Sequence, residues 1–309
     1  MGAAGELPST TGAFAHGVQS AFSIDLNDGQ EAGMNNSTHG TSHVWLDANS
    51  DEPEILEFDA CELAVYSRRC PNKESSNEDG ALILSIDGER TILAVADGCG
   101  GMNAGAQAAR ITLTALQRTL ANGANEPGSL RTPILDGIEK ANASVLNLGI
   151  GAATTLAVVE VLQETIRPYH IGDSQIVVVG NHGKIKLQTS AHSPVGYAVE
   201  AGVLSEDEAM YHQDRHVVSN VVGARDGHIE IGSRRRMSPR DTLLLATDGV
   251  FDNLHVEEIC ALIRKGPLIN AARNLAMQTQ ARIETSEVDN PSKPDDSTFI
   301  LFRRRLNPK

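Results

Sequence analysis

Short apolar runs separated by turn residues make up most of the chain after residue 54. The runs are four to nine residues long and rich in Val, Ile, Leu or Thr, a composition typical of β-strands. They predict strands at 62–67, 81–86, 91–96, 154–162, 165–171, 175–179, 184–188, 228–231, 241–247 and 297–303. Turn sequences lie between neighbouring runs, and Asp87-Gly88 predicts a two-residue hairpin.

Apolar residues spaced three and four positions apart predict helices between these strands. The predicted helices cover 111–120, 134–148, 256–263 and 267–275. Ser205 and Glu208 have the spacing of a capping box, which predicts a further short helix within 190–223. Because the strands are grouped in hairpins and the helices in pairs, the pattern favours an α+β domain over a βαβ alternation.

The charged residues are distributed unevenly along the chain. The chain has 309 residues and a net charge of −14, and 11 of its 40 acidic residues precede Arg68, the first basic residue. The 29 acidic and 26 basic residues that follow nearly balance, which argues against a nucleic-acid-binding protein with a basic face. We therefore expect an acidic, disordered leader at 1–53, one catalytic domain at 54–305 and a tail at 306–309.

Hydropathy and cysteine spacing indicate where the protein acts. No apolar run approaches the roughly 18 residues that span a bilayer, and the N-terminus has no apolar signal segment, so we expect no membrane association and no secretion. The four cysteines are too far apart for a CxxC zinc or redox motif, and they indicate structural thiols in a reducing compartment. A cytoplasmic monomer is the expectation.

Two segments end an apolar strand with Asp-Gly. The runs at 91–96 and 242–246 lead into Asp97-Gly98 and Asp248-Gly249, and a helix follows each. A strand buried on both faces can present a carboxylate only at its end, and a glycine there lets the backbone approach an ion closely. Asp-Gly is also a common turn sequence, so these two segments alone leave a purely structural role open.

Further short polar segments follow one another in a fixed order. Together with the two Asp-Gly segments they resemble the ordered motifs of the metal-dependent PP2C-type (PPM) protein serine/threonine phosphatases. The matching segments are Asn77-Glu78-Asp79, Asp97-Gly98-Cys99-Gly100-Gly101, Gly151-Ala152-Ala153-Thr154-Thr155, Gly172-Asp173-Ser174, Asp248-Gly249-Val250-Phe251-Asp252 and Asp295-Asp296-Ser297-Thr298. The resemblance covers about residues 62–304 and implies two packed antiparallel β-sheets flanked by helices, a PP2C-like β-sandwich.

The resemblance also implies a reaction and its residues. The reaction would be hydrolysis of phosphoserine and phosphothreonine in proteins, opposing a serine/threonine kinase, by water that two Mg²⁺ or Mn²⁺ ions activate. The implied ligands of these ions are Asp97, the Gly98 carbonyl, Asp248 and Asp295, with Glu78 and Asp79 acting through the ions' waters. Asp79, Asp97 and Asp248 would be the catalytic carboxylates. Asp173 and Asp252 match a third ion site, and residues 190–223 resemble the family's flap.

Elementary electrostatics independently points to cations. If Asp79, Asp97, Asp248 and Asp295 converge, each pair of unit charges about 4 Å apart repels by about 4 kcal/mol at an effective dielectric constant near 20. Either the carboxyl pKa values rise or cations neutralise the cluster. Oxygen ligands without His or Cys select hard ions such as Mg²⁺ or Mn²⁺ rather than zinc.

Two positions depart from the family's pattern. Glu74 stands where many members have an arginine that holds the phosphate, so Arg68, Arg69 or Lys73 would have to take over this role. Cys99 stands where some members have a histidine, so protonation of the leaving group would fall to metal-bound water. The Glu74 departure leaves one alternative open, namely a catalytically inactive PPM-like domain that binds a phosphoprotein or a signalling partner.

Two short basic runs, 234–236 and 303–305, have no counterpart in these motifs. We expect both runs to be solvated faces, and docking of a phosphorylated partner is the alternative.

Overall fold

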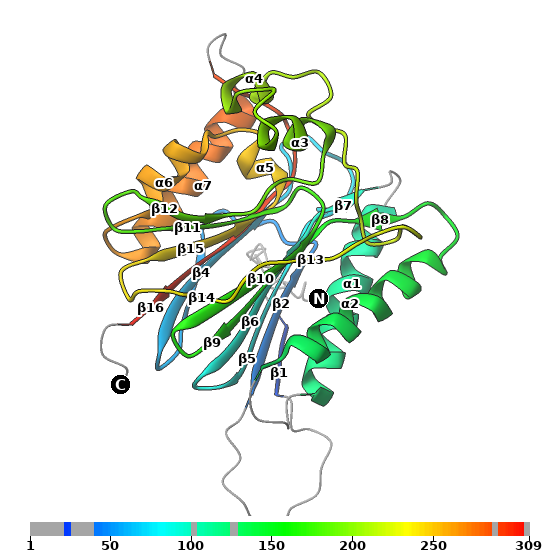
Figure 1. Cartoon of the computed structure of the whole chain (residues 1–309), viewed down its shortest axis with the longest axis vertical. Coiled ribbons are helices and arrows are strands. Elements are labelled where there is room, and N and C mark those ends of the chain that lie inside the picture. Colours follow the sequence, from blue (N-terminus) through cyan, green and yellow to red (C-terminus); the bar gives the residue numbers. More distant parts are fainter. Residues whose placement is uncertain (1–21, 26–39, 100–103, 124–128, 286–289, 306–309) are drawn as a thin grey trace, which may run out of the picture.

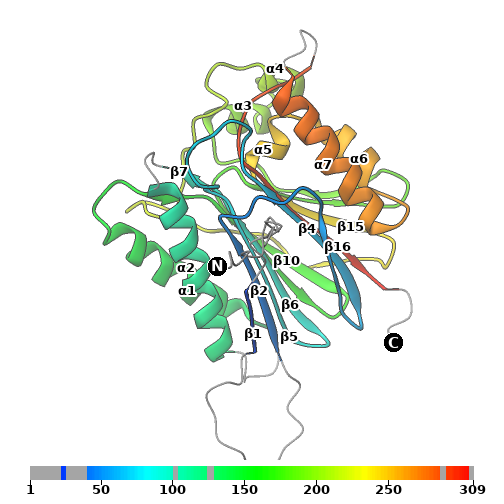
Figure 2. The same ribbon diagram turned by 180° about the vertical axis from the view of Figure 1, so that it is seen from behind.

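The computed structural model describes residues 22–25, 40–99, 104–123, 129–285 and 290–305. Two antiparallel β-sheets pack face to face, and helices cover the outer face of each sheet (Figures 1 and 2). The predicted α+β sandwich is therefore confirmed. Within the described residues, no helix combines the length and the apolar composition that crossing a membrane requires.

The first sheet is covered by two long helices. Its strands, in spatial order, are β1 (Phe22–Asp25), β2 (Thr41–Leu46), β5 (Gly80–Asp87), β6 (Arg90–Ala96), β9 (Leu156–Leu162), β10 (Thr165–Ile171) and β13 (Glu230–Ile231), with β14 (Arg235–Arg236) also pairing with β10. The helices α1 (Ala104–Gly123) and α2 (Arg131–Leu146) pack on its outer face.

The second sheet lies between the first sheet and the C-terminal helices. Its strands, in spatial order, are β12 (Ile185–Gln188), β11 (Gln175–Val179), β15 (Thr242–Ala246), β16 (Ser297–Arg304), β4 (Cys61–Arg68) and β3 (Glu54–Glu57). The covering helices are α5 (Asp248–Phe251), α6 (Val256–Ile263) and α7 (Leu268–Glu284). At one end of the sandwich lie α3 (Pro194–Glu200), α4 (Glu206–Met210) and the small pair of β7 (Gly98–Cys99) with β8 (Ala153–Thr154).

Alternate residues of the central strands enter two different hydrophobic cores. In β5, Leu82 and Leu84 pack against the helices of the first sheet, whereas Ala81 and Ile83 pack between the two sheets. Both faces of such a strand are buried, so the strand is a continuous apolar run rather than an alternating one. The sequence predicts these central strands from such continuous runs.

The strand register brings distant residues together at one end of the sandwich. Gly80 of β5 pairs with Ala96 of β6, so residue 79, just before β5, and residue 97, just after β6, lie at neighbouring strand ends. Ala246 of β15 pairs with Phe299 of β16, and the Thr247 N–H donates to the Thr298 carbonyl at 3.0 Å. The antiparallel pairing therefore places the segments after β6 and β15 beside the segments before β5 and β16.

The expected start of the folded domain at residue 54 is corrected by the structure. Residues 41–46 form β2, which pairs with β5 along its whole length, and Trp45 is buried between the sheets. The sequence did not predict this strand, because its polar residues interrupt the apolar run by which strands are recognised. The strand is held in place by its pairing with β5. Ser42 is buried and accepts a hydrogen bond from Gln117 Nε2 of α1 at 2.8 Å. The rest of the expected leader, apart from residues 22–25 and 40–53, and the tail at 306–309 lie outside the described residues.

Smaller differences concern turns and short elements. The loop between β5 and β6 is Gly88-Glu89, one residue later than predicted, because Asp87 pairs with Arg90 and its carboxylate accepts the Glu89 and Arg90 N–H groups. The predicted capping box at Ser205 and Glu208 is confirmed at the start of α4. The sequence did not predict β3, β7, β14, α3 or α5, which are too short to carry a periodic pattern.

We predict that Leu93→Ala destabilises the protein by about 2–5 kcal/mol, because Leu93 of β6 is fully buried between the sheets and its removal leaves a cavity. Urea denaturation followed by circular dichroism measures the change. Met277→Ala on α7 is the control, because Met277 is 59% exposed and its truncation should change the free energy of unfolding by less than about 0.5 kcal/mol. Equal losses in both variants would contradict this core assignment.

Candidate active site

Carboxylates from several segments gather at one end of the sandwich. All but Asp252 lie within two residues of a strand end, because β6 and β15 are buried along almost their whole length and admit a charged side chain only at their ends. They precede β5 (Glu78, Asp79) and β16 (Asp295, Asp296), follow β6 (Asp97) and β10 (Asp173), and lie at the start and after the end of α5 (Asp248, Asp252).

Three carboxylates of the cluster surround the ammonium group of Lys293. Its Nζ lies 2.7 Å from Asp252 Oδ2 and 3.3 Å from Asp295 Oδ2, and it also donates to Asp248 Oδ2. The Lys293 backbone is fixed by Asn253, whose side chain accepts the Lys293 N–H and donates to its carbonyl. Burial alone would lower the pKa of Lys293, but the three carboxylates raise it, so the group stays charged.

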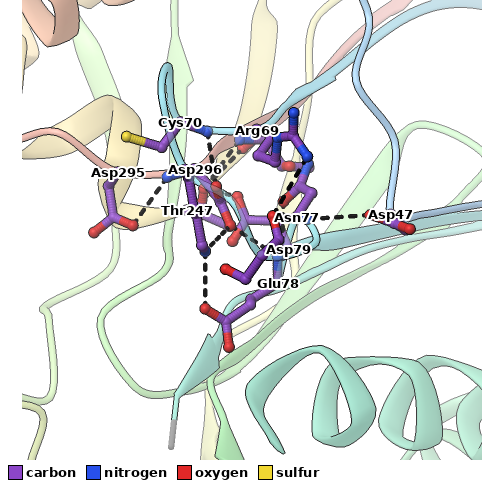
Figure 3. A network of polar contacts seen from close by, with 12 residues as sticks. Asp47, Arg69, Cys70, Asn77, Glu78, Asp79, Thr247, Asp295 and Asp296 are labelled. Atoms are coloured by element: carbon purple, nitrogen blue, oxygen red, sulfur yellow. Dashed lines mark hydrogen bonds and ion pairs between the residues drawn. The ribbon is translucent and has the colours of Figure 1, made fainter. Parts of the chain in front are cut away.

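A second ammonium group, that of Lys73, contacts two other carboxylates. Its Nζ lies 2.6 Å from Asp296 Oδ2 and 2.8 Å from Glu78 Oε2. Asp296 is buried and also accepts the backbone N–H groups of Cys70 and Glu78, each at 2.8 Å (Figure 3). Asp296 therefore ties the loop between β4 and β5 to the start of β16.

Thr247, the residue before Asp248, orients another carboxylate. Its hydroxyl donates to Asp79 Oδ2 at 2.8 Å and accepts the Thr298 N–H at 3.1 Å. The Asp79 N–H in turn donates to Asn77 Oδ1 at 2.9 Å (Figure 3). Asp79 is thus held from both sides at the meeting point of the two sheets.

Two glycines allow the backbone segments of the site to touch. A Cβ on Gly98 would lie 2.2 Å from the Gly105 carbonyl oxygen, and a Cβ on Gly249 would lie 1.8 Å from the Asp296 carbonyl oxygen. Real side chains do not approach backbone atoms so closely, so these contacts require glycine. This is the physical reason for glycine after both Asp97 and Asp248.

The carboxyl groups of the cluster have raised pKa values. Burial is the largest cause in each case, followed by repulsion from neighbouring carboxylates. The pKa rises well above its ordinary value for Asp79, Asp97 and Asp173, to about 7 for Asp295 and to about 6 for Asp252. Repulsion from Asp248 contributes to all five shifts. Burial, with these carboxylates, also raises the pKa of Cys99 to about 12, so its thiol stays protonated and is no nucleophile.

The donor set fits divalent cations. Among the described residues, Glu78 Oε1 and Asp173 Oδ1 are buried oxygens without a hydrogen-bond partner, although such atoms are rare in folded proteins. They lie in a cluster with at least six other carboxylates and two ammonium groups, as described above. Oxygen atoms without imidazole or thiolate neighbours are the ligands that Mg²⁺ and Mn²⁺ prefer.

Comparisons with known proteins agree with this geometry. The profile of the family described as Protein phosphatase 2C matches residues 68–281, which is more than half of the chain. The chain belongs to the protein phosphatase 2C family.

Individual phosphatase 2C relatives are moderately similar. A Streptococcus pyogenes protein described as protein phosphatase 2C-type is 31% identical over 200 residues, which are 62% of this chain and 80% of that protein. The S. agalactiae serine/threonine phosphatase structure has a TM-score of 0.68 and 25% identity, covering 79% of this chain and 99% of that one. The catalytic domain of the phosphatase PstP in complex with 2 manganese ions has a TM-score of 0.63 and 23% identity, covering 80% and 99%.

The phosphatase 2C motifs predicted from the sequence meet in space, but the candidate phosphate-binding residues do not all lie with them. Lys73 contacts the carboxylate cluster. Arg69 donates to the Ser75 carbonyl at 3.5 Å, and Arg68 lies 3.4 Å from Asp51. Glu74, in place of the family's arginine, is exposed.

Three residues of the site were not singled out from the sequence. Asp296 is matched only as a member of the last motif and is given no role, Lys293 lies in an irregular segment, and Thr247 follows an apolar strand. The family pattern itself gave a signal only for Asp296, as an extra carboxylate in the last motif. The roles of Lys293 and Thr247 depend on contacts with partners 41 to 168 residues away in sequence.

A His–His–Glu group lies beside the Gly172-Asp173 turn. Ligand atoms of His170, His192 and Glu230 lie within 4.8 Å of one another. However, His192 Nδ1 accepts the Gly172 N–H at 3.1 Å and contacts Asn220 Nδ2 at 2.8 Å, so its proton is on Nε2, which faces Glu230 at 3.1 Å. This tautomer leaves no lone pair for a metal, and the group instead joins the turn to the 190–230 segment.

We predict that Asp252→Asn stabilises the metal-free protein more at pH 8 than at pH 4.5, where about a third of the effect remains because that pH lies between the pKa values of the unfolded and the folded state. Folding raises the pKa of Asp252 from 3.8 to about 6, so the ionised carboxylate opposes folding above that range and the proton relieves it below. The stabilisation at pH 8 is at most about 3 kcal/mol, since one pKa unit corresponds to about 1.4 kcal/mol.

Thermal unfolding in EDTA at both pH values measures this difference. Asp226→Asn is the matched control, because Asp226 is exposed and has no partner among the described residues. A stabilisation by Asp252→Asn that is equal at both pH values would contradict the raised pKa.

Proposed function

We propose that the protein hydrolyses phosphoserine and phosphothreonine in proteins with the help of bound Mg²⁺ or Mn²⁺. The observation that carries the proposal is the gathering of buried carboxylates with raised pKa values and unpartnered oxygens at one end of the sandwich. A fold-level relative crystallised with 2 manganese ions supports the choice of ion.

The proposed ion ligands are the residues that the sequence motifs gave. Two ions would be held by Asp97, the Gly98 carbonyl, Asp248 and Asp295, with Glu78 and Asp79 nearby, and a third by Asp173 and Asp252. When bound, such ions supply an activated water and neutralise charge on the phosphoryl group. Asp79, Asp97 and Asp248 are the proposed catalytic carboxylates.

The chain's own residues pre-arrange this site. Thr247 and Asn77 hold Asp79 in one orientation, and Asp97 is fixed because its N–H donates to Thr155 Oγ1 at 3.1 Å and its carbonyl accepts the Thr155 N–H at 2.8 Å. A fixed ligand set needs no rearrangement when charge develops during the reaction.

We assign the phosphate-binding role to Lys73 rather than to Arg68 or Arg69. The ammonium group of Lys73 is held at the carboxylate cluster by Asp296 and Glu78, whereas Arg68 pairs with exposed Asp51. Burial alone would lower the pKa of Lys73, but the hydrogen bonds that its ammonium donates to Asp296 and Glu78 raise the pKa, so the group stays charged.

Substrate choice is assigned to residues 190–223, the proposed flap. A cavity of about 400 Å³ lies between this segment and the carboxylates, and its wall includes Val195, Met210, Asp173 and Asp252. It has apolar and acidic sides, which suits the peptide that flanks a phosphorylated residue.

The partners of the proposed reaction are phosphoproteins, and a serine/threonine kinase would supply them. A cytoplasmic location is part of the same proposal. All four cysteines are free in the structure, which supports a reducing compartment.

We predict that Asp248→Ala lowers manganese-dependent hydrolysis of p-nitrophenyl phosphate and of a phosphothreonine peptide by at least about 100-fold. The reason is that the proposed metal site loses one of its carboxylate ligands. Removal of metal by EDTA should abolish the wild-type rate. Asp226→Ala, a substitution of an exposed carboxylate, should leave the rate unchanged. A wild type no faster than Asp248→Ala would overturn the enzyme assignment and favour an inactive phosphoprotein-binding domain.

We predict that Lys73→Ala raises the KM for a phosphothreonine peptide and the inhibition constant of inorganic phosphate about 10-fold or more, the effect of losing a charged hydrogen bond of about 1.5–3 kcal/mol. Lys73→Arg should restore part of the affinity. Arg68→Ala is the comparison, and it should change neither constant. The reverse result, with Arg68→Ala the damaging variant, would move the phosphate-binding role to Arg68.

A further inference from the structure

A basic cavity lies at the opposite end of the sandwich from the carboxylates. Its volume is about 350 Å³, it is open to solvent, and it is lined by the ends of β16 and α6 and by the turn before β15. The cations that line it are Arg240, Arg264, Lys265, Arg303, Arg304 and Arg305. Among the described residues, Glu62 is the single acidic one in its lining. This concentration is unusual in a chain whose net charge is −14.

Most of the positive charge in this cavity is not neutralised by carboxylates. Within the described part of the chain, Arg240 and Lys265 are exposed and make no hydrogen bond or ion pair. Arg264 donates to the Asn181 carbonyl at 2.9 Å, which is a neutral partner. By contrast, Arg305 pairs with Glu57 at 2.7 Å, and Arg304 lies 3.9 Å from Glu164. Donors of at least three cations therefore remain available to an anion.

Arg303 adds a fixed charge at the wall of the cavity. Its guanidinium donates to Thr242 Oγ1 at 2.9 Å and to the carbonyls of Ile263 at 3.0 Å and Gly266 at 2.6 Å, all neutral acceptors. Burial lowers the pKa of Arg303, and Glu62 opposes this only in part. A partly buried cation held by neutral groups makes the cavity favourable for negative charge.

The cavity and the carboxylate cluster are linked by the same strand. Asp296 directly precedes β16 and Arg303 lies near its end, seven residues on, which corresponds to about 23 Å at roughly 3.3 Å per residue. A small phosphate ester at the carboxylate end cannot reach the cavity, whereas a protein substrate can contact both ends at once.

We propose that this basic cavity is a second binding site for the protein substrate, and that it takes an acidic segment of a phosphoprotein, rich in Asp and Glu or further phosphorylated. The inference rests on the proposed function. Arginine matches the geometry of carboxylates and phosphates through paired N–H donors, and several such contacts along one segment add to the affinity of the reactive site. The cations line a concavity, and Glu57 and Glu62 lie beside them, which favours a narrow peptide over a flat membrane surface.

Two synthetic phosphothreonine peptides test the proposal. Both carry a hexaglutamate run, joined by a spacer of about twelve residues in one peptide and about three in the other. At roughly 3.3–3.6 Å per extended residue, the long spacer alone covers the 23 Å that separate Asp296 from Arg303 along β16, whereas the short spacer leaves half of the glutamate run short of the cavity. The wild type should therefore show a KM at least fivefold lower for the long-spacer peptide, and equal rates at saturating substrate.

The variants are matched in charge. Arg240→Glu/Lys265→Glu should remove the KM advantage of the long spacer, without affecting hydrolysis of p-nitrophenyl phosphate. Arg110→Glu/Arg118→Glu changes two exposed arginines of α1, on the other face of the sandwich, by the same total charge and should leave the advantage intact. Equal KM values for both spacers in the wild type, or equal losses in both double variants, would overturn the proposal.

Direct binding separates this proposal from the catalytic one. Fluorescence anisotropy of a labelled hexaglutamate peptide without phosphate should show binding that Arg240→Glu/Lys265→Glu weakens at least fivefold, whether or not the protein hydrolyses anything. Failure to hydrolyse either phosphopeptide would count against the proposed function alone. Vesicles of phosphatidylglycerol and phosphatidylcholine form the competing arm, and binding of vesicles but not of the peptide through these two residues would overturn the acidic-peptide assignment.

Discussion

Repulsion among buried carboxylates is the constraint on which the rest of this structure depends. Each unit-charge pair about 4 Å apart costs about 4 kcal/mol at an effective dielectric constant near 20, and at least eight acidic side chains gather at one end of the sandwich. Burial first, and this crowding second, raise the pKa values of Asp79, Asp97 and Asp173. Two lysines offset part of it, and divalent cations would offset more.

A site of this kind needs a rigid frame, because the carboxylates would otherwise move apart. The two sheets provide it, since their central strands are buried on both faces and end at the cluster. Close backbone contacts at Gly98 and Gly249 and the Thr247 hydroxyl then fix the approach of the segments. The stability of the core and the geometry of the site are therefore parts of one arrangement.

The two ends of the sandwich have opposite electrostatic character. Strands β15 and β16 connect them, with the Asp248 and Asp296 carboxylates at one end and the Arg303 guanidinium at the other. The neutral partners of Arg303 distinguish this basic end from an ordinary salt-bridged surface, as do Arg240 and Lys265, which have no partner in the described part of the chain. A phosphoprotein large enough to contact both ends would meet cation-binding carboxylates and anion-binding arginines on one rigid body.

The sequence by itself determined the α+β class, most of the strands and helices, and the order of the acidic motifs. It could do so because strands buried on both faces are continuous apolar runs and because Asp-Gly at their ends is a local signal. Tertiary structure alone decided that β2 belongs to the first sheet, that Lys73 rather than Arg68 contacts the carboxylates, and that Lys293, Thr247 and Asp296 complete the cluster. These features depend on partners far away in sequence, such as Asp79 and Thr247, 168 residues apart, and no local pattern records which side chains the packing of two sheets brings within hydrogen-bonding distance.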